Sequence, residues 1–417
     1  MAPKASSSSK VMFTLLQSAV ISLSVCAIVG TLAGCAGGAL QTPPPAPAPG
    51  GVIGPAPQGN LPAPQDEVAP TLPSILQAKS RWIAVGWADL PGFASDPLYE
   101  AWNAWLKSCE KPLAPWAALC GDVRRLSIAS ADEQRQWMLR RLQPYRVESL
   151  QVTQPEGLLT AYYEPVLDAA RKPDANFKVP LYLPPVNLAQ KKPWYTRQEM
   201  DTLPAAQTAL RGREIAYLVD PIDALVLQIQ GSGRLRITQA DGSKVTVRLA
   251  YAGTNDQPYK SVGRWLLDQG AIKDATWPGI KAWTQQNPKR VQEMIWSNPR
   301  TVFFREEALL KEDGSGDASG DGSAGSTYPG PKGAQGVALT AGRSIAVDPG
   351  SIPYGTPVWL VSNGPQVNLQ KLVMAQDTGS AIVGAVRADY FAGSGLEAGE
   401  LAGRVKQPLK LWVLWPR

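Results

Sequence analysis

Asp377 lies in the stretch of the chain whose residues are best suited to acid–base chemistry, LVMAQDTGSAIVGAVRADYFAGSG at 372–395. The apolar run Leu372–Ala375 predicts a buried strand, and a Thr-Gly turn follows the carboxylate directly. Burial among apolar neighbours would raise the pKa of this carboxyl and keep it protonated. Asp377 is therefore the first candidate for a general acid. Ordinary turn chemistry is the alternative, since Asp and Gly dominate tight turns for conformational reasons alone.

The composition narrows the chemistry further. The 417 residues contain no histidine, which excludes Ser-His-Asp and Cys-His catalysis and disfavours a catalytic zinc site. Acid–base work must then fall to Asp, Glu, Lys, Tyr or Cys. The net charge of +6 comes without a basic tract interleaved with aromatics, so we expect no nucleic-acid partner. We expect neither a cofactor nor a metal.

Two short motifs also occur in other classes of enzyme, but the rest of the sequence disfavours membership of those classes. Gly231-Ser232-Gly233 resembles part of a phosphate loop, but no GKS/T sequence or helix start follows. Ser232 as a nucleophile would need a lysine base, and no SxxK pair stands near it. Asp-Thr-Gly also occurs in aspartic proteases, which need two such aspartates, and the chain has one copy. A homodimeric protease would have far shorter chains.

Polar residues alternate where the predicted strand at 224–229 ends. Gln228, Gln230, Ser232 and Arg234 could hydrogen-bond sugar hydroxyls or simply cap the turn. The sequence leaves both interpretations open.

The N-terminal segment predicts export. Residues 1–34 combine two lysines, an apolar run and small residues, the parts of a secretory signal. Val11–Gly34 is also long enough to serve as an uncleaved membrane anchor. The tetrad Leu32–Cys35 resembles the bacterial lipoprotein cleavage box, which implies a lipidated Cys35 at the start of the mature protein. No aspartate follows it, so we expect an outer-membrane lipoprotein on the periplasmic face. Residues 35–71 would then form a Pro/Ala-rich tether.

Cys109 and Cys120 remain as an even pair in the body of the chain. In an exported protein they predict a disulfide that closes a short loop. Two buried thiols are the alternative.

Hydrophobic spacing predicts mostly short strands with few helices. Helices are expected at 98–106, 131–142, 196–210, 261–270 and 288–296. Strands are expected at 151–161, 178–183, 224–229, 234–238, 244–251, 337–339, 344–347, 357–361, 372–375 and 409–414. Many short strands at this spacing are typical of a barrel. The low-complexity residues 312–331 predict a disordered insertion.

Five stretches, in order, resemble the membrane-bound lytic murein transglycosylase A family. They are TAYYEP at 160–165, IQGSGR at 229–234, NPRTVFFRE at 298–306, GRSIAVD at 342–348 and AQDTGSAI at 375–382. The resemblance implies a mainly β fold, with a double-psi β-barrel built from 72–165 and 299–417. A second β-barrel domain would be inserted at 166–298, with the glycan in the groove between them. Ala161 stands where the family pattern has glycine.

The resemblance also implies a reaction and its residues. A single acid, corresponding to Asp377, would cleave the β-1,4 bond between N-acetylmuramic acid and N-acetylglucosamine in peptidoglycan. The C6 hydroxyl of the substrate would act as nucleophile and leave a 1,6-anhydro sugar. Asp389 and Asp348 are the expected orienting residues. The expected glycan-binding residues are Tyr162, Tyr163, Gln230, Ser232 and Arg234, and plain core packing is the alternative for the two tyrosines.

Expected partners are peptidoglycan glycan strands and the outer membrane, with cell-wall synthesis or remodelling complexes as a further class. The competing hypothesis is a double-psi barrel that binds peptidoglycan without cleaving it, because a tethered, aromatic-rich wall protein would have a similar composition.

Overall fold

A computed structural model describes residues 72–151, 156–239, 241–309 and 329–417 of the chain. The predicted signal segment, Cys35, the tether and most of the 312–331 insertion lie outside these residues. Within the described ranges, no helix is long and apolar enough to cross a membrane.

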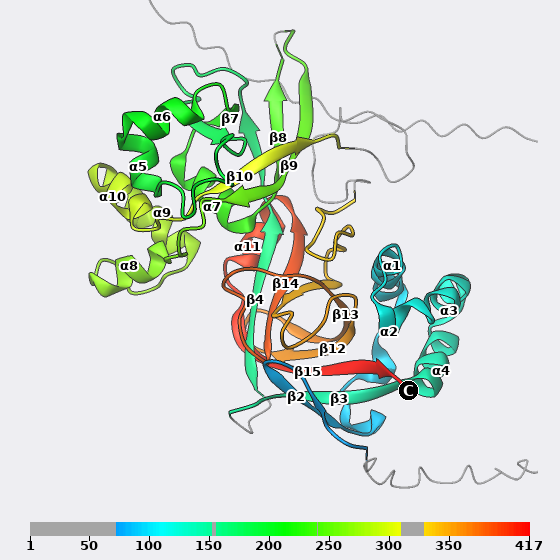
Figure 1. Cartoon of the computed structure of the whole chain (residues 1–417). Coiled ribbons are helices and arrows are strands. Elements are labelled where there is room, and N and C mark those ends of the chain that lie inside the picture. Colours follow the sequence, from blue (N-terminus) through cyan, green and yellow to red (C-terminus); the bar gives the residue numbers. More distant parts are fainter. Residues whose placement is uncertain (1–71, 152–155, 240, 310–328) are drawn as a thin grey trace, which may run out of the picture. The chain divides into compact units, whose positions relative to one another are not determined.

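Nine strands form the largest sheet, and six of them close into a ring (Figure 1). Their order is β1 (Ile75–Leu76), β2 (Ser80–Ala84), β3 (Leu142–Ser149), β15 (Lys406–Pro416), β12 (Pro357–Asn363), β13 (Asn368–Asp377), β11 (Ser344–Val347), β14 (Arg387–Ser394) and β4 (Gly157–Glu164). Strand β4 pairs a second time, with β15, and this pairing closes the ring. The β11–β13 and β14–β4 pairs are parallel. Segments from both ends of the described chain therefore build one closed sheet.

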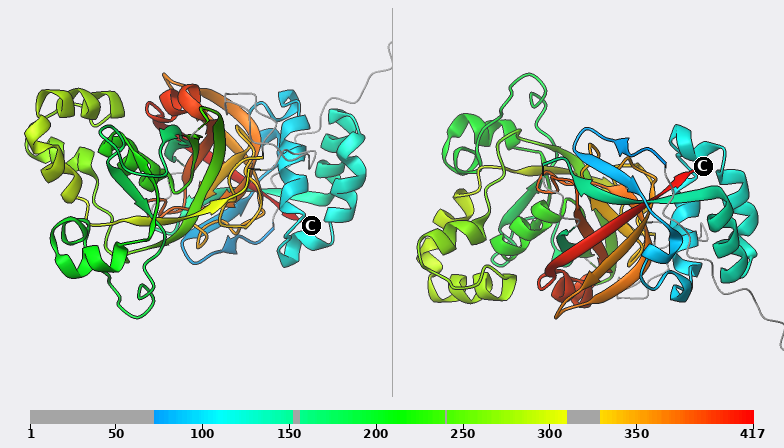
Figure 2. Two further views of the ribbon diagram at one scale, coloured as in Figure 1. Left: turned by 90° about the horizontal axis from the view of Figure 1, so that it is seen from above. Right: turned by 90° about the horizontal axis from the view of Figure 1, so that it is seen from below.

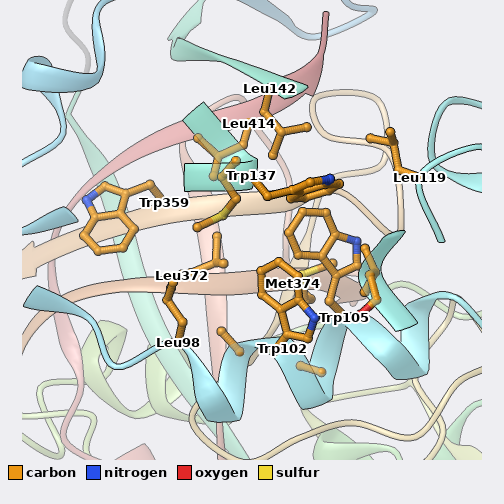
Figure 3. Packing of buried hydrophobic residues seen from close by; sticks show 14 of the residues in the cluster. Leu98, Trp102, Trp105, Leu119, Trp137, Leu142, Trp359, Leu372, Met374 and Leu414 are labelled. Atoms are coloured by element: carbon orange, nitrogen blue, oxygen red, sulfur yellow. Dashed lines mark hydrogen bonds between the residues drawn. The ribbon is translucent and has the colours of Figure 1, made fainter. Parts of the chain in front are cut away.

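Four helices cover one side of this sheet and supply its largest apolar core (Figures 1 and 2). They are α1 (Tyr99–Ser108), α2 (Ala114–Ala117), α3 (Cys120–Arg125) and α4 (Ala131–Arg141). Trp102, Trp105 and Trp137 pack edge to face or tilted against one another, next to Leu372 and Met374 of β13 (Figure 3). Burial of such large side chains stabilises, by the hydrophobic effect, the face of β13 that these helices cover.

Cys109 and Cys120 are joined by a disulfide with an S–S distance of 1.97 Å. The bond connects the residue that follows α1 to the first residue of α3. It therefore fixes the end of α1 relative to the next helices.

At Pro165 the chain passes from β4 into a second group of elements. Its strands are β5 (Val166–Ala169), β6 (Val179–Tyr182), β7 (Glu214–Leu218), β8 (Gly233–Thr238), β9 (Lys244–Thr254) and β10 (Val302–Glu307). Its helices are α5 (Arg197–Thr202), α6 (Pro204–Leu210), α7 (Pro221–Gln230), α8 (Val262–Asp268), α9 (Trp277–Gln286) and α10 (Val291–Trp296). Four strands pair in the order β10-β9-β8-β5, and β6 pairs with β7. A bridge between Ala170 and Tyr217 connects the two sheets.

Short elements complete the fold. Helix α11 (Gly395–Ala402) follows β14, and 3-10 helices occupy Trp87–Asp89, Phe93–Ser95, Leu126–Ile128 and Pro288–Arg290.

Most predicted elements are confirmed. The predicted helices at 98–106, 131–142, 261–270 and 288–296 overlap α1, α4, α8 and α10. The predicted strands at 178–183, 234–238, 244–251, 344–347, 357–361, 372–375 and 409–414 overlap β6, β8, β9, β11, β12, β13 and β15. The predicted strand at 151–161 overlaps β4.

The predicted strand at 224–229 is wrong, because these residues lie in α7. Asp220 caps the helix through its side chain, which accepts a 2.8 Å hydrogen bond from the Ile222 amide. Pro221 occupies the first helical position, and Gly231 ends the helix with φ +81°. Residues 222 and 224–227 are all buried, so the apolar run carries no helical periodicity. Gln228 and Gln230 therefore lie in a helix, not along a strand exit.

Two further predictions of local structure are corrected. The helix expected at 196–210 is two helices, because Pro204 cannot donate an amide to a continuing helix and instead begins α6. The strand expected at 337–339 is a single bridge between Ala338 and Lys332.

The expectation of a mainly β fold with few helices is also wrong. The described ranges contain eleven α-helices besides the sheets, so the fold is mixed α/β. Several of these helices have six or seven residues, too short for a clear periodic signal.

Candidate active site

Asp377 is the last residue of β13, and its half-buried carboxylate accepts three hydrogen bonds. The backbone amides of Thr378 and Ala334 donate to Oδ1 over 2.8 and 2.9 Å. The Tyr162 hydroxyl donates to Oδ2 over 2.8 Å. The buried strand fixes the backbone, and the three donors fix the orientation of the side chain.

Burial raises the pKa of Asp377 to about 6. The Thr378 amide, the Tyr162 hydroxyl and the Ala334 amide oppose this rise because they stabilise the charged carboxylate. The negative charge of Asp389 raises the pKa further. A carboxyl with a pKa near neutrality can give up a proton in one step and accept one in the next.

The amide of Ala334 reaches Asp377 because a loop, residues 332–336, passes close to the end of β13. A side chain at Gly333 would place its Cβ 2.4 Å from the Gln376 carbonyl oxygen and 3.2 Å from the Cβ of Asp377. Only glycine permits this approach without displacement of the backbone. The sequence analysis missed Ala334, since it attributed no site to this part of the chain; the Pro-Lys-Gly sequence at 331–333 is the one local signal of a turn.

Tyr162 combines a core position with a contact in the site. Its ring packs against Phe391 at 5.3 Å between centroids, in a small cluster with Leu339, Ala346 and Ile382. Burial raises the pKa of Tyr162 well above its ordinary value, and the charge of Asp377 adds to this. The phenol is therefore a neutral donor to the Asp377 carboxylate. Core packing, one of the two interpretations left open for this residue, is confirmed for the ring, and glycan contact stays a prediction.

Asp389 lies on β14, opposite Ala346 of β11 and Thr160 of β4. The Thr160 hydroxyl donates a hydrogen bond to Asp389, and Arg387 donates to Thr160 over 2.8 Å. Burial raises the pKa of Asp389, while Thr160 and the Arg387 charge lower it. The structure thus couples Asp389 electrostatically to Asp377. The sequence analysis gave Thr160 no role of its own, although this residue begins the TAYYEP stretch.

Asp348 lies in the turn after β11, and its carboxylate forms hydrogen bonds with residues other than Asp377. Its carboxylate accepts hydrogen bonds from Lys79 and from the amides of Gly384 and Gly350, at 2.9 to 3.0 Å. Burial alone would raise the pKa of Asp348, but these bonds lower it below the ordinary value. The geometry gives this ionised carboxylate a role in holding three loops together.

Tyr354, another residue that the sequence analysis missed, lies near Asp377. Burial raises the pKa of its half-buried phenol, a side-chain hydrogen bond with Thr378 lowers it, and the charge of Asp377 raises it again. Thr378 itself donates to the Val347 carbonyl over 2.7 Å. Tyr354 is therefore close enough to Asp377 for the charge of the carboxylate to affect its pKa.

Three of the predicted glycan-binding residues lie where β4 meets the second group of elements. The Gln230 side chain accepts a 3.0 Å hydrogen bond from the Tyr163 amide. Arg234 is buried, and its Nε donates to Glu164 over 2.7 Å. Ser232 is half-buried in the turn between α7 and β8. These contacts show how the two groups of elements are joined, and glycan contact by these residues stays a prediction.

Glu164, which the sequence analysis did not single out, is the centre of this junction. It is fully buried, and it also accepts hydrogen bonds from Arg248 of β9 over 2.7 Å and from Ser394 of β14 over 2.8 Å.

Within the described ranges, no group of three or more His, Cys, Asp or Glu side chains could hold a metal ion.

Comparisons with known proteins agree with this architecture. Residues 158–305 match the model of the MltA specific insert domain, and residues 343–415 match the 3D domain. Membrane-bound lytic murein transglycosylase A of Vibrio cholerae is 30% identical over 272 residues. That match covers 62% of this chain and 65% of the relative, so the chain matches just under two thirds of that protein's length.

Solved structures extend the likeness. A lytic transglycosylase of Burkholderia pseudomallei, LtgG, is 39% identical with a TM-score of 0.54, and the match covers 84% of this chain and 99% of that one. Escherichia coli MltA with bound chitohexaose has a TM-score of 0.62 over 80% of this chain and 94% of its own. At 23% identity this second likeness concerns the fold alone. The chain therefore belongs to the MltA family of lytic murein transglycosylases.

Proposed function

We propose that this protein is a lytic transglycosylase that cleaves the β-1,4 bond between N-acetylmuramic acid and N-acetylglucosamine in peptidoglycan. The observation that carries the proposal is the Asp377 carboxyl, held by three donors with a pKa of about 6 at a strand end. The family relationship supports the substrate class.

In the proposed mechanism Asp377 works twice. Its protonated form gives the proton to the glycosidic oxygen, so that N-acetylglucosamine departs as an alcohol. The carboxylate formed then accepts the proton of the C6 hydroxyl of N-acetylmuramic acid, while that oxygen bonds to C1. The product is 1,6-anhydro-N-acetylmuramic acid, and no water is consumed. The attack is intramolecular, so proximity replaces an enzymic nucleophile.

The neighbouring residues take supporting roles in this proposal. The charge of Asp389 adds to the rise in the pKa of Asp377 that burial causes, and Asp348 orients the loops around the site. Tyr163, Gln230, Ser232 and Arg234 shape the region where the glycan would lie. Since Arg234 is buried against Glu164, we assign it to positioning the strands.

The finer fold assignment is part of the same proposal. The closed six-strand ring with two parallel pairs supports a double-psi β-barrel built from 72–165 and 299–417. The Ala170–Tyr217 bridge supports a second barrel built from the insertion expected at 166–298, to whose larger sheet β10 adds residues 302–307. We further propose attachment to the periplasmic face of the outer membrane through a lipidated Cys35, in keeping with relatives named membrane-bound.

Mass spectrometry of purified peptidoglycan strands digested by the purified protein tests the activity. We expect fragments that end in 1,6-anhydro-N-acetylmuramic acid, and we expect Asp377→Asn to lose turnover while glycan binding is retained. Reducing-end products would replace the proposal with a hydrolase that uses a second carboxylate. Binding without any cleavage would favour the non-catalytic peptidoglycan-binding protein.

A further inference from the structure

We propose that Gln335 is a positioning residue for Asp377, because it anchors the 332–336 loop to the disulfide-bonded end of α1. The inference rests on the proposed function in one respect: it takes Asp377 to be the catalytic acid. The loop matters because its Ala334 amide is one of the three donors to the Asp377 carboxylate.

Gln335 bonds to the protein through both its backbone and its side chain. Its amide donates to the Gln376 carbonyl over 3.0 Å, which docks the loop on the end of β13. Its side-chain nitrogen donates to the carbonyls of Ser108 and Lys111, each over 3.2 Å. Its side-chain oxygen accepts from the Ser108 hydroxyl over 3.2 Å. One glutamine therefore connects the loop to the turn that ends α1.

The turn that receives Gln335 is itself fixed. Cys109 lies between Ser108 and Lys111, and its disulfide to Cys120 connects this turn to α3. Ser108 has a second side-chain partner, because the side-chain nitrogen of the buried Gln376 donates to its hydroxyl over 2.8 Å. Gln376, the residue before Asp377, and the 332–336 loop therefore bond to the same turn at the end of α1.

Without the side-chain anchor, the loop would keep the Gln335 amide bond to the Gln376 carbonyl but would lose its bonds to the end of α1, so the Ala334 amide would be held from one side only. Ala334 and Lys332 are exposed, and Gln335 itself is half-buried. The loop keeps the Gly333–Val337 backbone bond, which ties it only to its own end. Release of the Gln335 side chain should therefore lengthen or break the Ala334–Asp377 bond and leave the buried core intact.

The loss of one N–H donor has a defined electrostatic consequence. The donor stabilises the charged carboxylate, so its removal raises the pKa of Asp377 above about 6. A carboxylate that accepts two or three amide bonds can lie about 2 pH units below its ordinary value, so one bond is worth roughly 0.5 to 1 pH unit.

The test compares Gln335→Met with the wild-type protein. Selective carbon-13 labelling of Asp and an NMR titration, with the signal assigned by Asp377→Asn, gives the pKa of Asp377 without any substrate. We expect a rise of roughly 0.5 to 1 pH unit and an equal shift of the alkaline limb of kcat/KM. Unchanged values in a folded Gln335→Met variant would overturn the inference.

Gln134→Met is the matched control. Gln134 is a buried glutamine of α4 whose side chain donates to the Leu126 carbonyl over 2.9 Å, so the substitution removes the same kind of bond from the same helical layer. It should leave the Asp377 titration unchanged. An equal shift in this control would assign the effect to general loosening and would contradict the inference.

A double-mutant cycle with Ser108→Ala locates the contact. If Gln335 acts through Ser108, the pKa shifts of the two single variants should not add in the double variant. Strict additivity would contradict this route. The titration needs no turnover, so a protein that failed to release anhydro products would sink the proposed function while the positioning role of Gln335 was still decided.

Discussion

The hydroxyl of Tyr162 lies 2.8 Å from the Asp377 carboxylate, although the two residues are 215 positions apart. Their strands are not neighbours, since β11 and β14 stand between β13 and β4 in the sheet. The contact therefore exists because the sheet closes on itself. It brings a neutral donor to a buried acid, and much of the expected chemistry depends on that pair.

Tyr162→Phe should raise the pKa of Asp377, because the carboxylate loses a donor that stabilises its charged form. We expect the alkaline limb of the pH–rate profile to move to higher pH. We also expect kcat/KM at its optimum to fall by about tenfold, in line with a hydrogen bond to a charged group. A pH series of glycan cleavage measures both. Tyr163→Phe is the control, since Tyr163 points to the opposite face of β4, and an identical shift there would refute the assignment.

Asp377→Asn should stabilise the folded protein at neutral pH. The folded pKa of about 6 exceeds the ordinary carboxyl value of 3.8, so the folded state holds its proton more tightly than the unfolded state does. Wild-type stability then falls as pH rises from about 4 to 6, whereas that of the variant does not. The variant should gain about 3 kcal/mol in free energy of unfolding above pH 6 and nothing well below pH 4.

Denaturant unfolding at a series of pH values checks this gain. Asp348→Asn provides the opposite sign, because the pKa of Asp348 is lowered and its charge stabilises the fold at neutral pH. A loss of stability in Asp377→Asn at pH 7 would show that burial of the charged Asp377 carboxylate does not destabilise the folded protein.

Gly333→Ala should reduce activity sharply with little effect on global stability. The added methyl would lie 2.4 Å from the Gln376 carbonyl oxygen, so the exposed loop must move and carry the Ala334 amide away from Asp377. We expect a fall in kcat of about tenfold or more, since small displacements at an active site cost about this much or more. Gly121→Ala, on α3 with open space around it, should be neutral. Full activity of Gly333→Ala would show that the loop has room for a side chain next to the Gln376 carbonyl oxygen.

Glu164→Gln should destabilise the protein by about 3 kcal/mol, because it removes the buried carboxylate charge to which two buried arginines bond. The side chains of Arg234 and Arg248 are 3% and 7% exposed, and that of Glu164 is 0% exposed. Thermal and denaturant unfolding measure the cost.

Glu148→Gln is a matched comparison for this change. Glu148 also bonds two arginines, Arg81 and Arg146, but both are 38% exposed and can be hydrated when the charge is lost. We expect a cost of about 1 kcal/mol or less there. Equal costs for the two variants would argue that burial of the Glu164 cluster is unimportant.

The sequence by itself determined the features that depend on neighbours in the chain. The apolar run before Asp377 predicted the strand, because apolar runs are read from neighbouring residues, whereas the burial that raises the pKa of the acid comes from the tertiary structure. The strand at 344–347 followed from the same reasoning. Cys109 and Cys120 were found by arithmetic, since they are the two cysteines left in the body of the chain.

Local signals were also misread where burial removed their periodicity. The run at 224–229 begins with four consecutive apolar residues that are all buried in α7, so it resembled a strand. The caps Asp220-Pro221 and Gly231 were the better evidence, since they depend on backbone chemistry and not on surroundings.

Only the tertiary structure decided which groups meet Asp377. Thr378 follows it directly, but Ala334 is 43 positions away and Tyr162 is 215. Strand pairing and ring closure set those distances, and no pattern within a window of the sequence encodes them. The same holds for Asp348 and Asp389, two carboxylates that look alike in sequence. Asp348 is ion-paired with Lys79 and its pKa is lowered, while burial raises the pKa of Asp389, because the sheet surrounds the two carboxylates differently.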